Sequence, residues 1–292
     1  MGSGTSDILS KMHAHPKLGE GLGDGIEISF SSGLNRTSDS DLFREDGRGW
    51  PVHEGKTIHQ YNHVWSRPRF TVPSREGLKR EDKPKYNKQH RKFYNSYRLV
   101  FRNISSPTNM RTLVSTIVPP KTFLAHSMSY LMLKRNGVLV LDNEYLQNIA
   151  QLCGVLNSTP CDFVARQTTQ VNIPAIIKQI PLLPRNKEIA ELAARLVVGH
   201  RDFAALAEAL RIPNTALSVR ERISTAARLD ALVAKSYGLD KSEYRTILES
   251  FRGFRENPDL WDAEEIAWDN RNLKEFYGEM RKKALEIFDD VT

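Results

Sequence analysis

The sequence predicts an α+β fold in which a basic, strand-rich module precedes a helical module. In the first half, short segments rich in β-branched and aromatic residues alternate with polar stretches, a pattern typical of strands. From about Asp142 onward, apolar residues recur at helical spacing instead. The charge also changes there: residues 48–135 hold 18 Lys and Arg against four acidic residues, a balance of +14, whereas the whole chain has a net charge of +7.

The first half contains six segments that we expect to be strands. They are 26–30, 56–61, 97–104, 111–119, TFLAHSMSYLML and GVLVLD. Between Arg67 and Phe93 lies a polar stretch rich in Lys and Arg. We expect it to form either a long mobile loop or a weakly ordered insertion, and long loops inside compact domains often have a function.

The second half begins with a strong helix signal at NEYLQNIAQLCGVLNS (143–158). Thr159 then resembles an N-cap, because a proline follows it and Asp162 stands three positions on, and the helix should run through Arg166. An apolar connector, IPAIIKQIPLLP, comes next. Further helix signals are a start near Asn186, capping boxes at Asp240 and Asp262, and a last helix over about 263–288.

These patterns divide the chain into four parts. The predicted parts are a tag remnant (MGSGTSD) with a connector at 1–40, a strand-rich recognition module at 41–141, connecting helices with an apolar connector at 142–186, and a helical module at 187–292.

Several classes of protein are disfavoured by composition. No apolar run approaches the roughly 20 residues of a membrane span, so we expect no membrane partner. The N-terminus lacks a secretory signal, and Cys153 and Cys161 sit in helix-like stretches, where disulfide use is not expected. A cytoplasmic location is therefore the expectation.

Catalytic and metal-binding motifs are also missing. The sequence has no G-x-S-x-G motif, no phosphate-binding loop and no cluster of paired carboxylates in its basic half. His59 and His63 are four residues apart, which along a strand is about 13 Å, too far for two ligands of one ion. We therefore predict no catalytic residue and no metal ligand in this chain.

Nucleic-acid binding remains, and the stretch VHEGKTIHQYNHVWSRPRF (52–70) favours it. Arg side chains pair with guanine, and Gln or Asn side chains pair with adenine. In the basic stretch that follows, Lys85, Lys88, Arg91 and Lys92 would contact phosphates without reading sequence. The competing interpretation is that the aromatic residues of 52–70 belong to the core and its histidines to the surface.

A family resemblance covers nearly the whole chain from about Asp41. It rests on five segments in order: HEGKTIHQYNHVW (53–65), YRLVFRNISSPTNMRTLVSTIVPP (97–120), LCGVLNSTPCDFVARQ (152–167), IIKQIPLLP (176–184) and ARLDALVAKSYGLDKSEYRTILESF (227–251). Together they resemble the C-terminal half of large adenine-N6 DNA methyltransferases of restriction–modification and phage-defence systems, including type IIG, BREX and DISARM enzymes.

The resemblance implies a target-recognition region that reads double-stranded DNA for a catalytic domain absent from this chain. That domain would bring S-adenosylmethionine and an N-P-P-[YF] motif, whereas the only Pro-Pro here is Pro119-Pro120, followed by Lys121. The chain itself would bind no cofactor, and other defence-system subunits are possible partners. The residues expected to face DNA are His59, Gln60, Tyr61, Asn62, His63, Arg67, Arg69, Lys85, Lys88, Arg91, Arg166 and Gln167.

Two alternatives stay open. A structural cap role for Arg166 is as consistent with the sequence as a DNA contact. The helical module could also make the whole chain a protein-interaction scaffold of a defence complex, with no direct DNA readout.

Overall fold

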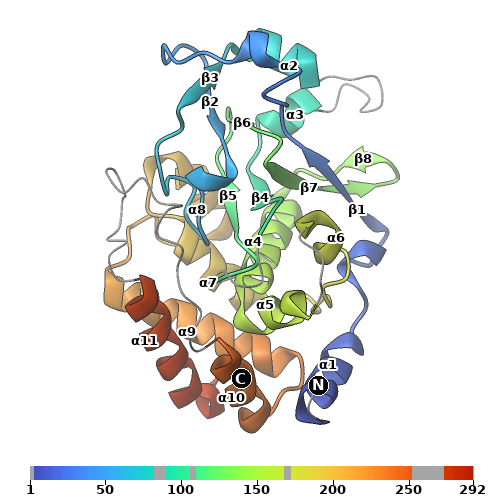
Figure 1. Cartoon of the computed structure of the whole chain (residues 1–292), viewed down its shortest axis with the longest axis vertical. Helices are drawn as coiled ribbons and strands as arrows, with labels where there is room; N and C mark the ends of the chain where they lie inside the picture. Colours follow the sequence, from blue (N-terminus) through green and yellow to red (C-terminus); the bar gives the residue numbers. More distant parts are fainter. Residues whose placement is uncertain (1–2, 82–89, 106–109, 168–171, 252–272, 292) are drawn as a thin grey trace.

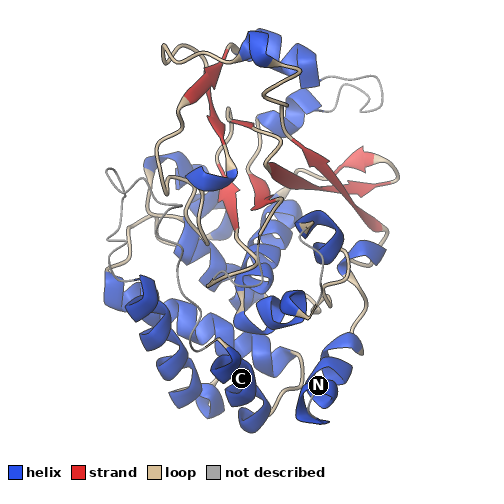
Figure 2. Cartoon of the chain, in the orientation of Figure 1, coloured by secondary structure: helices blue, strands red, loops and turns tan. Residues whose placement is uncertain are grey.

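The computed structural model describes residues 3–81, 90–105, 110–167, 172–251 and 273–291 (Figure 1). The predicted α+β fold is confirmed: the strands gather in one half of the molecule, and most helices lie in the other (Figure 2). Within the described residues, no helix is both long enough and apolar enough to cross a bilayer.

An antiparallel five-stranded sheet forms the middle of the molecule. Its strand order is β1-β7-β4-β5, with β8 paired to β7. The strands are β1 (Ile26–Ser32), β4 (Arg98–Arg102), β5 (Ser115–Val118), β7 (Met128–Arg135) and β8 (Val138–Leu139). Asn136 and Gly137, with φ of 51° and 73°, join β7 to β8, because a tight hairpin turn needs positive φ at both central positions.

A second, three-stranded sheet has the order β3-β2-β6. We call this sheet, together with helices α2 and α3, the upper lobe; it lies at the top of Figure 1. The elements are β2 (Trp50–His53), β3 (Phe70–Val72), α2 (Ser74–Glu81), α3 (His90–Tyr94) and β6 (Phe123–Leu124). At Gly77 of α2 an added Cβ would come within 2.4 Å of the Phe123 ring, so glycine permits the helix to approach the sheet.

The upper lobe has its own small core, and the N-terminal segment contributes to it. Leu34 and Leu42 pack there with residues of the small sheet and α2. Helix α1 (Ser3–His13) likewise places Ile8 and Met12 in the main core. Much of the region 1–40 is therefore part of the fold and more than a connector, since α1 and β1 are built into it. The origin of MGSGTSD as a tag remnant stays a prediction.

The helices of the lower half are arranged around α4. They are α4 (Asn143–Asn157), α5 (Thr159–Arg166), α6 (Ile173–Ile177), α7 (Lys187–Val197), α8 (Ala204–Leu210), α9 (Val219–Ser236), α10 (Lys241–Ser250) and α11 (Leu273–Glu286). Helix α4 contacts both the five-stranded sheet and α7, while α9 lies between α7 and α11. An added Cβ at Gly154 would lie 3.0 Å from Cβ of Ala193, so glycine allows α4 and α7 to pack closely.

Most helix starts agree with the sequence signals. The Asp240 capping box is present at α10, and α4 and α5 span nearly the predicted residues. The N-cap of α5 is Ser158 rather than Thr159, because the Ser158 hydroxyl accepts a hydrogen bond from the Cys161 amide. The predicted capping box at Asp262 lies outside the described residues.

Two local predictions fail. Residues 56–61 form no strand: a 3-10 turn, η3 (Gly55–Thr57), precedes a tight turn in which Tyr61 has φ of 60°. The predicted loop between Arg67 and Phe93 contains β3, α2 and α3, and its central residues 82–89 are outside the described part of the chain.

The two expected modules are not separate bodies. One apolar cluster runs without a break from the five-stranded sheet into α4, α7, α9 and α11. The described residues also form short 3-10 helices at η1 (Leu18–Glu20), η2 (Ser40–Leu42), η5 (Arg201–Phe203) and η8 (Phe288–Asp290). The strand-rich part therefore shares one apolar core with the helices.

Candidate nucleic-acid interface

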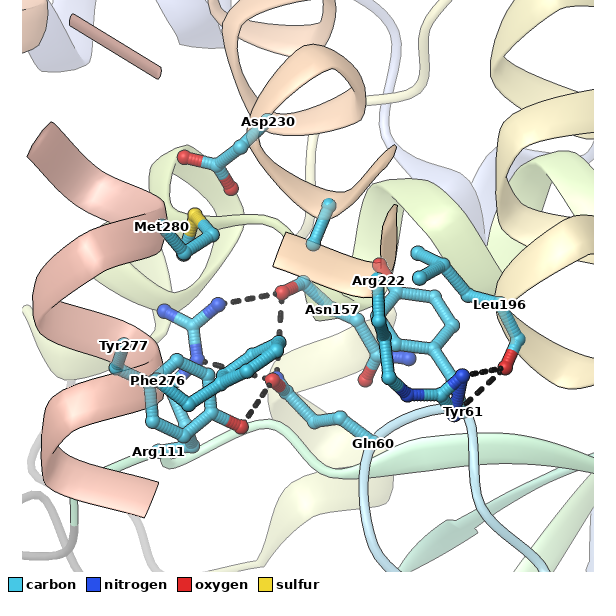
Figure 3. Close-up of a pocket in the computed structure, with 11 residues that line it drawn as sticks. Gln60, Tyr61, Arg111, Asn157, Leu196, Arg222, Asp230, Phe276, Tyr277 and Met280 are labelled. Carbon is cyan, nitrogen blue, oxygen red and sulfur yellow. Dashed lines mark hydrogen bonds between the residues drawn. The ribbon is translucent and has the colours of Figure 1, made fainter. Parts of the chain in front are cut away.

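The turn that the sequence marks most strongly, residues 59–63, lies inside the molecule. His59, Gln60, Asn62 and His63 are 3–6% exposed, and Tyr61 is half-buried. The turn is inserted between the sheet and the helical half, and Gln60 and Tyr61 line a small internal cavity (Figure 3).

Gln60 uses all of its hydrogen-bonding capacity within the protein. Its amide nitrogen donates to the carbonyls of Leu113, at 2.9 Å, and Asn157, at 3.2 Å. Its amide oxygen accepts from Nε of Arg111, at 3.1 Å, and from the hydroxyl of Tyr277, at 2.8 Å. An amide has two donors and two acceptor lone pairs, so none is left for a base edge.

Arg111 is the centre of the same network. Its Nη2 donates to the Asn157 carbonyl at 2.7 Å, and its Nη1 lies 3.8 Å from the Asp162 carboxylate. Its guanidinium also stacks over the Tyr277 ring at 5.1 Å. Burial acts to lower the pKa of Arg111, but Asp162 and other nearby groups raise it overall. The buried charge is thus paired, as a core requires.

Asp162 links this arginine to the segment just before β5. Its carboxylate accepts hydrogen bonds from the backbone amides of Thr112 and Leu113, at 2.8–3.2 Å. Asn157 makes a matching pair of contacts with the backbone of Ser115, both near 3.0 Å. We call Gln60, Arg111, Asn157, Asp162 and Tyr277 the seam network, because they join the strand-rich part to α4, α5 and α11.

A second buried acid reinforces the seam from α9. Asp230 accepts from the Thr159 amide at 2.6 Å and from the Tyr244 hydroxyl at 2.5 Å. Burial raises its pKa, and these hydrogen bonds oppose that rise. Helices α5, α9 and α10 are therefore fixed to one another by a single carboxylate.

The cavity at the seam is small. It measures about 20 Å³ and is lined by polar groups of the seam network together with Arg222 and Met280 (Figure 3). A water molecule needs at least about 10–15 Å³ measured in this way, so there is room for about one. The cavity therefore does not accommodate a nucleotide base in this conformation.

The remaining residues of the turn are also engaged internally. The His59 ring lies 4.4 Å from that of Trp65, and burial holds its pKa well below the ordinary value. The side-chain oxygen of Asn62 accepts the Val64 amide at 2.9 Å. Tyr61 reaches the Gly154 carbonyl at 3.5 Å.

The expectation that residues 59–63 face DNA is thus wrong for His59, Gln60, Asn62 and His63. The physical reason is that a buried polar turn must have its hydrogen-bonding groups paired. The side-chain donors and acceptors that could read bases are used here to pair with other buried groups of the protein. A sequence shows the side chains but not the groups that pair with them.

The other predicted residues divide into three groups. Arg67, Arg69 and Arg91 are exposed, although Arg69 forms an ion pair with Glu45 at 2.9 Å. Lys85 and Lys88 lie outside the described residues.

Arg166 and Gln167 are engaged by other groups of the protein. Nη2 of Arg166 donates to the Met110 carbonyl at 2.7 Å, and its guanidinium lies 4.2 Å from the centre of the Phe251 ring. Gln167 donates to the Phe163 carbonyl at 3.1 Å. The structural role that the sequence left open for Arg166 is the one observed.

The cations of the upper lobe form a surface that the sequence indicates only weakly. We define the basic surface as seven exposed cations of this lobe and of the loops at its edge, none of which forms an ion pair with another described residue: Arg48, Arg67, Arg75, Lys79, Arg91, Lys92 and Lys121. Helices α2 and α3 pack against each other, and the Lys121 amide donates to the Tyr94 carbonyl at the end of α3. The signal in the sequence is the i, i+4 spacing of Arg75 and Lys79, which places them on one helix face.

Not every cation of the basic region contributes to this surface. Arg98 is completely buried, and its Nη2 donates to the Thr122 carbonyl at 2.5 Å. Arg80 is neutralised by Asp39 and Asp41, at 2.6 and 3.0 Å. The balance of +14 therefore overstates the charge that a ligand would meet.

Comparison with known proteins adds no family: no family model matches the chain, and no curated protein matches it.

Proposed function

We propose that the chain binds double-stranded DNA through the basic surface of the upper lobe, as the target-recognition region of an adenine-N6 DNA methyltransferase. The observation that carries the proposal is the gathering of seven exposed Lys and Arg residues on and beside one small lobe. Neutralising DNA phosphates releases condensed counterions, which makes such a surface a favourable docking site for a polyanion. The methyltransferase part rests on the sequence resemblance alone.

In this proposal the buried polar residues have a structural role, and the exposed cations have the binding role. The seam network fixes the sheets against the helices, and the upper lobe presents cations on a rigid support. In the proposed parent enzyme, S-adenosylmethionine and the reacting groups belong to a separate catalytic domain. We place the protein in the cytoplasm, in keeping with Cys153 and Cys161, which are both free and buried.

The experiment is a titration of labelled duplex DNA, followed by fluorescence anisotropy at several salt concentrations. In the test variant, four cations of the basic surface are replaced: Arg75→Gln, Lys79→Gln, Arg91→Gln and Lys92→Gln. In the matched control, four exposed cations of the helical part are replaced: Lys187→Gln, Arg220→Gln, Arg245→Gln and Lys282→Gln. Both variants lose the same net charge.

We expect log K to fall steeply with log salt for the wild type. Each phosphate that a removed cation no longer neutralises reduces the magnitude of this slope by about 0.9. The slope of the test variant, which lacks four cations, should therefore be less steep by up to about 3.6. The control should bind nearly as the wild type does. Equally weakened binding in both variants would mean that only net charge matters, and it would contradict a localised interface.

Sequence recognition is tested separately, by competition between unlabelled duplexes of different sequence at fixed salt. The target-recognition proposal expects one set of sequences to compete more strongly than the rest. If all duplexes compete alike, the chain binds DNA without reading it. If the wild type does not bind DNA at all, the scaffold alternative is favoured.

A further inference from the structure

Three side chains far apart in sequence meet beside the buried turn. His63 comes from the turn at 59–63, and His200 and Asp202 come from the start of η5. One potential ligand atom from each residue lies within 4.8 Å of the other two. Within the part of the chain that the structure describes, this is the only group of three such residues that could hold one metal ion.

Two of these atoms lie at a spacing that suits a shared ion. Nδ1 of His200 lies 3.1 Å from a carboxylate oxygen of Asp202, and it accepts a hydrogen bond from the Asp202 amide at 3.3 Å, which an ion would replace. Ligands at about 2.0–2.1 Å from a tetrahedral zinc ion are about 3.3 Å from one another. The ring of His63 lies 5.6 Å from that of His200, centre to centre, and nearly perpendicular to it. A small side-chain rotation would therefore bring the third nitrogen into range.

His63 is the buried member of the group. It is 5% exposed, whereas the side chains of His200 and Asp202 are each more than 40% exposed. An imidazole nitrogen is a common ligand of metal ions.

The backbone around the group is held firmly. Gly199 has φ of 115°, and its amide donates to the side chain of Asn214 at 3.1 Å. The Asp202 carbonyl accepts the Tyr97 hydroxyl at 2.9 Å, which ties η5 to the strand-rich part. The Phe203 ring packs edge-on against His63 at 4.8 Å. Support of this kind fixes ligand orientation before an ion arrives.

We propose that His63, His200 and Asp202 bind a divalent transition-metal ion of the zinc type, which joins the buried turn to η5. His200 and Asp202 are each more than 40% exposed on their side chains, so the ion has a path from solvent and one position open to water. Two imidazoles and a carboxylate suit Zn²⁺ and other first-row metals rather than Ca²⁺ or Mg²⁺. The site goes beyond DNA binding and does not depend on it.

The experiment uses the untagged whole chain, treated with chelator and then dialysed. Zn²⁺ is titrated by calorimetry, and Co²⁺ is added to a second sample, because four-coordinate Co²⁺ gives strong visible absorption. The variants are His200→Ala and Asp202→Ala, both at exposed positions. The matched control is His126→Ala, an exposed histidine outside the group.

We expect about one Zn²⁺ per chain and a rise in the thermal midpoint on binding, because a ligand of the folded state stabilises it. Each of the two test variants should weaken binding by about tenfold or more, and the control should not. Wild-type binding retained by both test variants would overturn the proposal, and so would failure of the wild type to bind Zn²⁺ or Co²⁺.

Discussion

Two arginines of the basic region, Arg111 and Arg91, show how differently the same residue type is used. Arg111 is 7% exposed and donates to the side chains of Gln60 and Thr159 and to the Asn157 carbonyl. Arg91 stands exposed on α3 and forms no ion pair with another described residue. In the sequence each adds one charge to the same total. In the structure one holds two parts of the molecule together, and the other can meet a ligand.

The contrast extends to the two regions as wholes. The seam is rich in groups that could read bases, but these groups satisfy one another and the backbone around them. The upper lobe offers mainly cations, and these cations face solvent. Surface charge is screened and adds little to stability, whereas a buried polar network is costly to break. Substitutions in the seam should therefore lower the stability of the fold, whereas substitutions on the upper lobe should leave stability unchanged and weaken DNA binding.

The largest effect should come from Arg111→Met. Its loss removes one of the two cations beside the buried Asp162, the other being Arg166 at 3.4 Å, and it removes a donor from Gln60. Breaking a buried pair from one side costs about 3–5 kcal/mol of unfolding free energy, and with Arg166 still in place we expect a loss of about 3 kcal/mol. Urea unfolding followed by circular dichroism measures it. Arg91→Met is the matched control, and its midpoint should stay at the wild-type value. If both variants were equally stable, the seam would not be a structural element.

A smaller effect should follow from pH, through His53. Burial lowers the pKa of His53 to about 4, below its unfolded value near 6.5. The unfolded chain therefore binds the proton more readily, and the stability that the neutral ring provides is present above about pH 6.5 and lost as pH falls toward 4. Between about pH 7 and 5 the loss from this residue is on the order of 2 kcal/mol.

Urea unfolding at several pH values measures this loss, and His53→Gln tests its source. The variant should flatten the dependence of stability on pH between 4 and 6.5. Some dependence should remain, because burial also lowers the pKa values of His59 and His63. A pH profile identical to that of the wild type would show that His53 is not buried in solution as it is here.

The smallest effect should come from Tyr277→Phe. It removes one hydrogen bond to Gln60, which keeps Arg111 as a second donor, so we expect a loss of about 0.5–1.5 kcal/mol. Tyr61→Phe is the matched control, because its hydroxyl makes a long 3.5 Å contact and should matter less. If the control proved the more damaging variant, the order of importance within the seam would be reversed.

The parts of the fold that could be predicted are those with a strong local pattern. Strands β1 and β4 and helices α4 and α10 follow from periodicity and capping residues. Residues 56–61 could not be predicted, because their β-branched residues resemble a strand while a local turn between Glu54 and Thr57 competes with strand pairing. Local propensity cannot decide between such alternatives when tertiary contacts supply the difference.

The candidate site was harder to predict than the fold. Net charge is a sum, and it counts Arg98 and Arg111 in the core together with Lys79 and Lys92 on the surface. Likewise, the sequence sets His63 beside His59 and gives no sign that His200 approaches it. Contacts over such separations depend on how η5 packs against the strand-rich part, which composition and spacing do not specify.

The central claim is that the upper lobe, and not the seam, meets DNA. Hydrogen–deuterium exchange of the whole chain, with and without duplex DNA at low salt, tests it most directly. We expect DNA to slow exchange in α2, α3 and the loops beside them, and to leave α9 and α11 unchanged. Protection confined to the helices around the seam, with α2 and α3 unaffected, would contradict the claim.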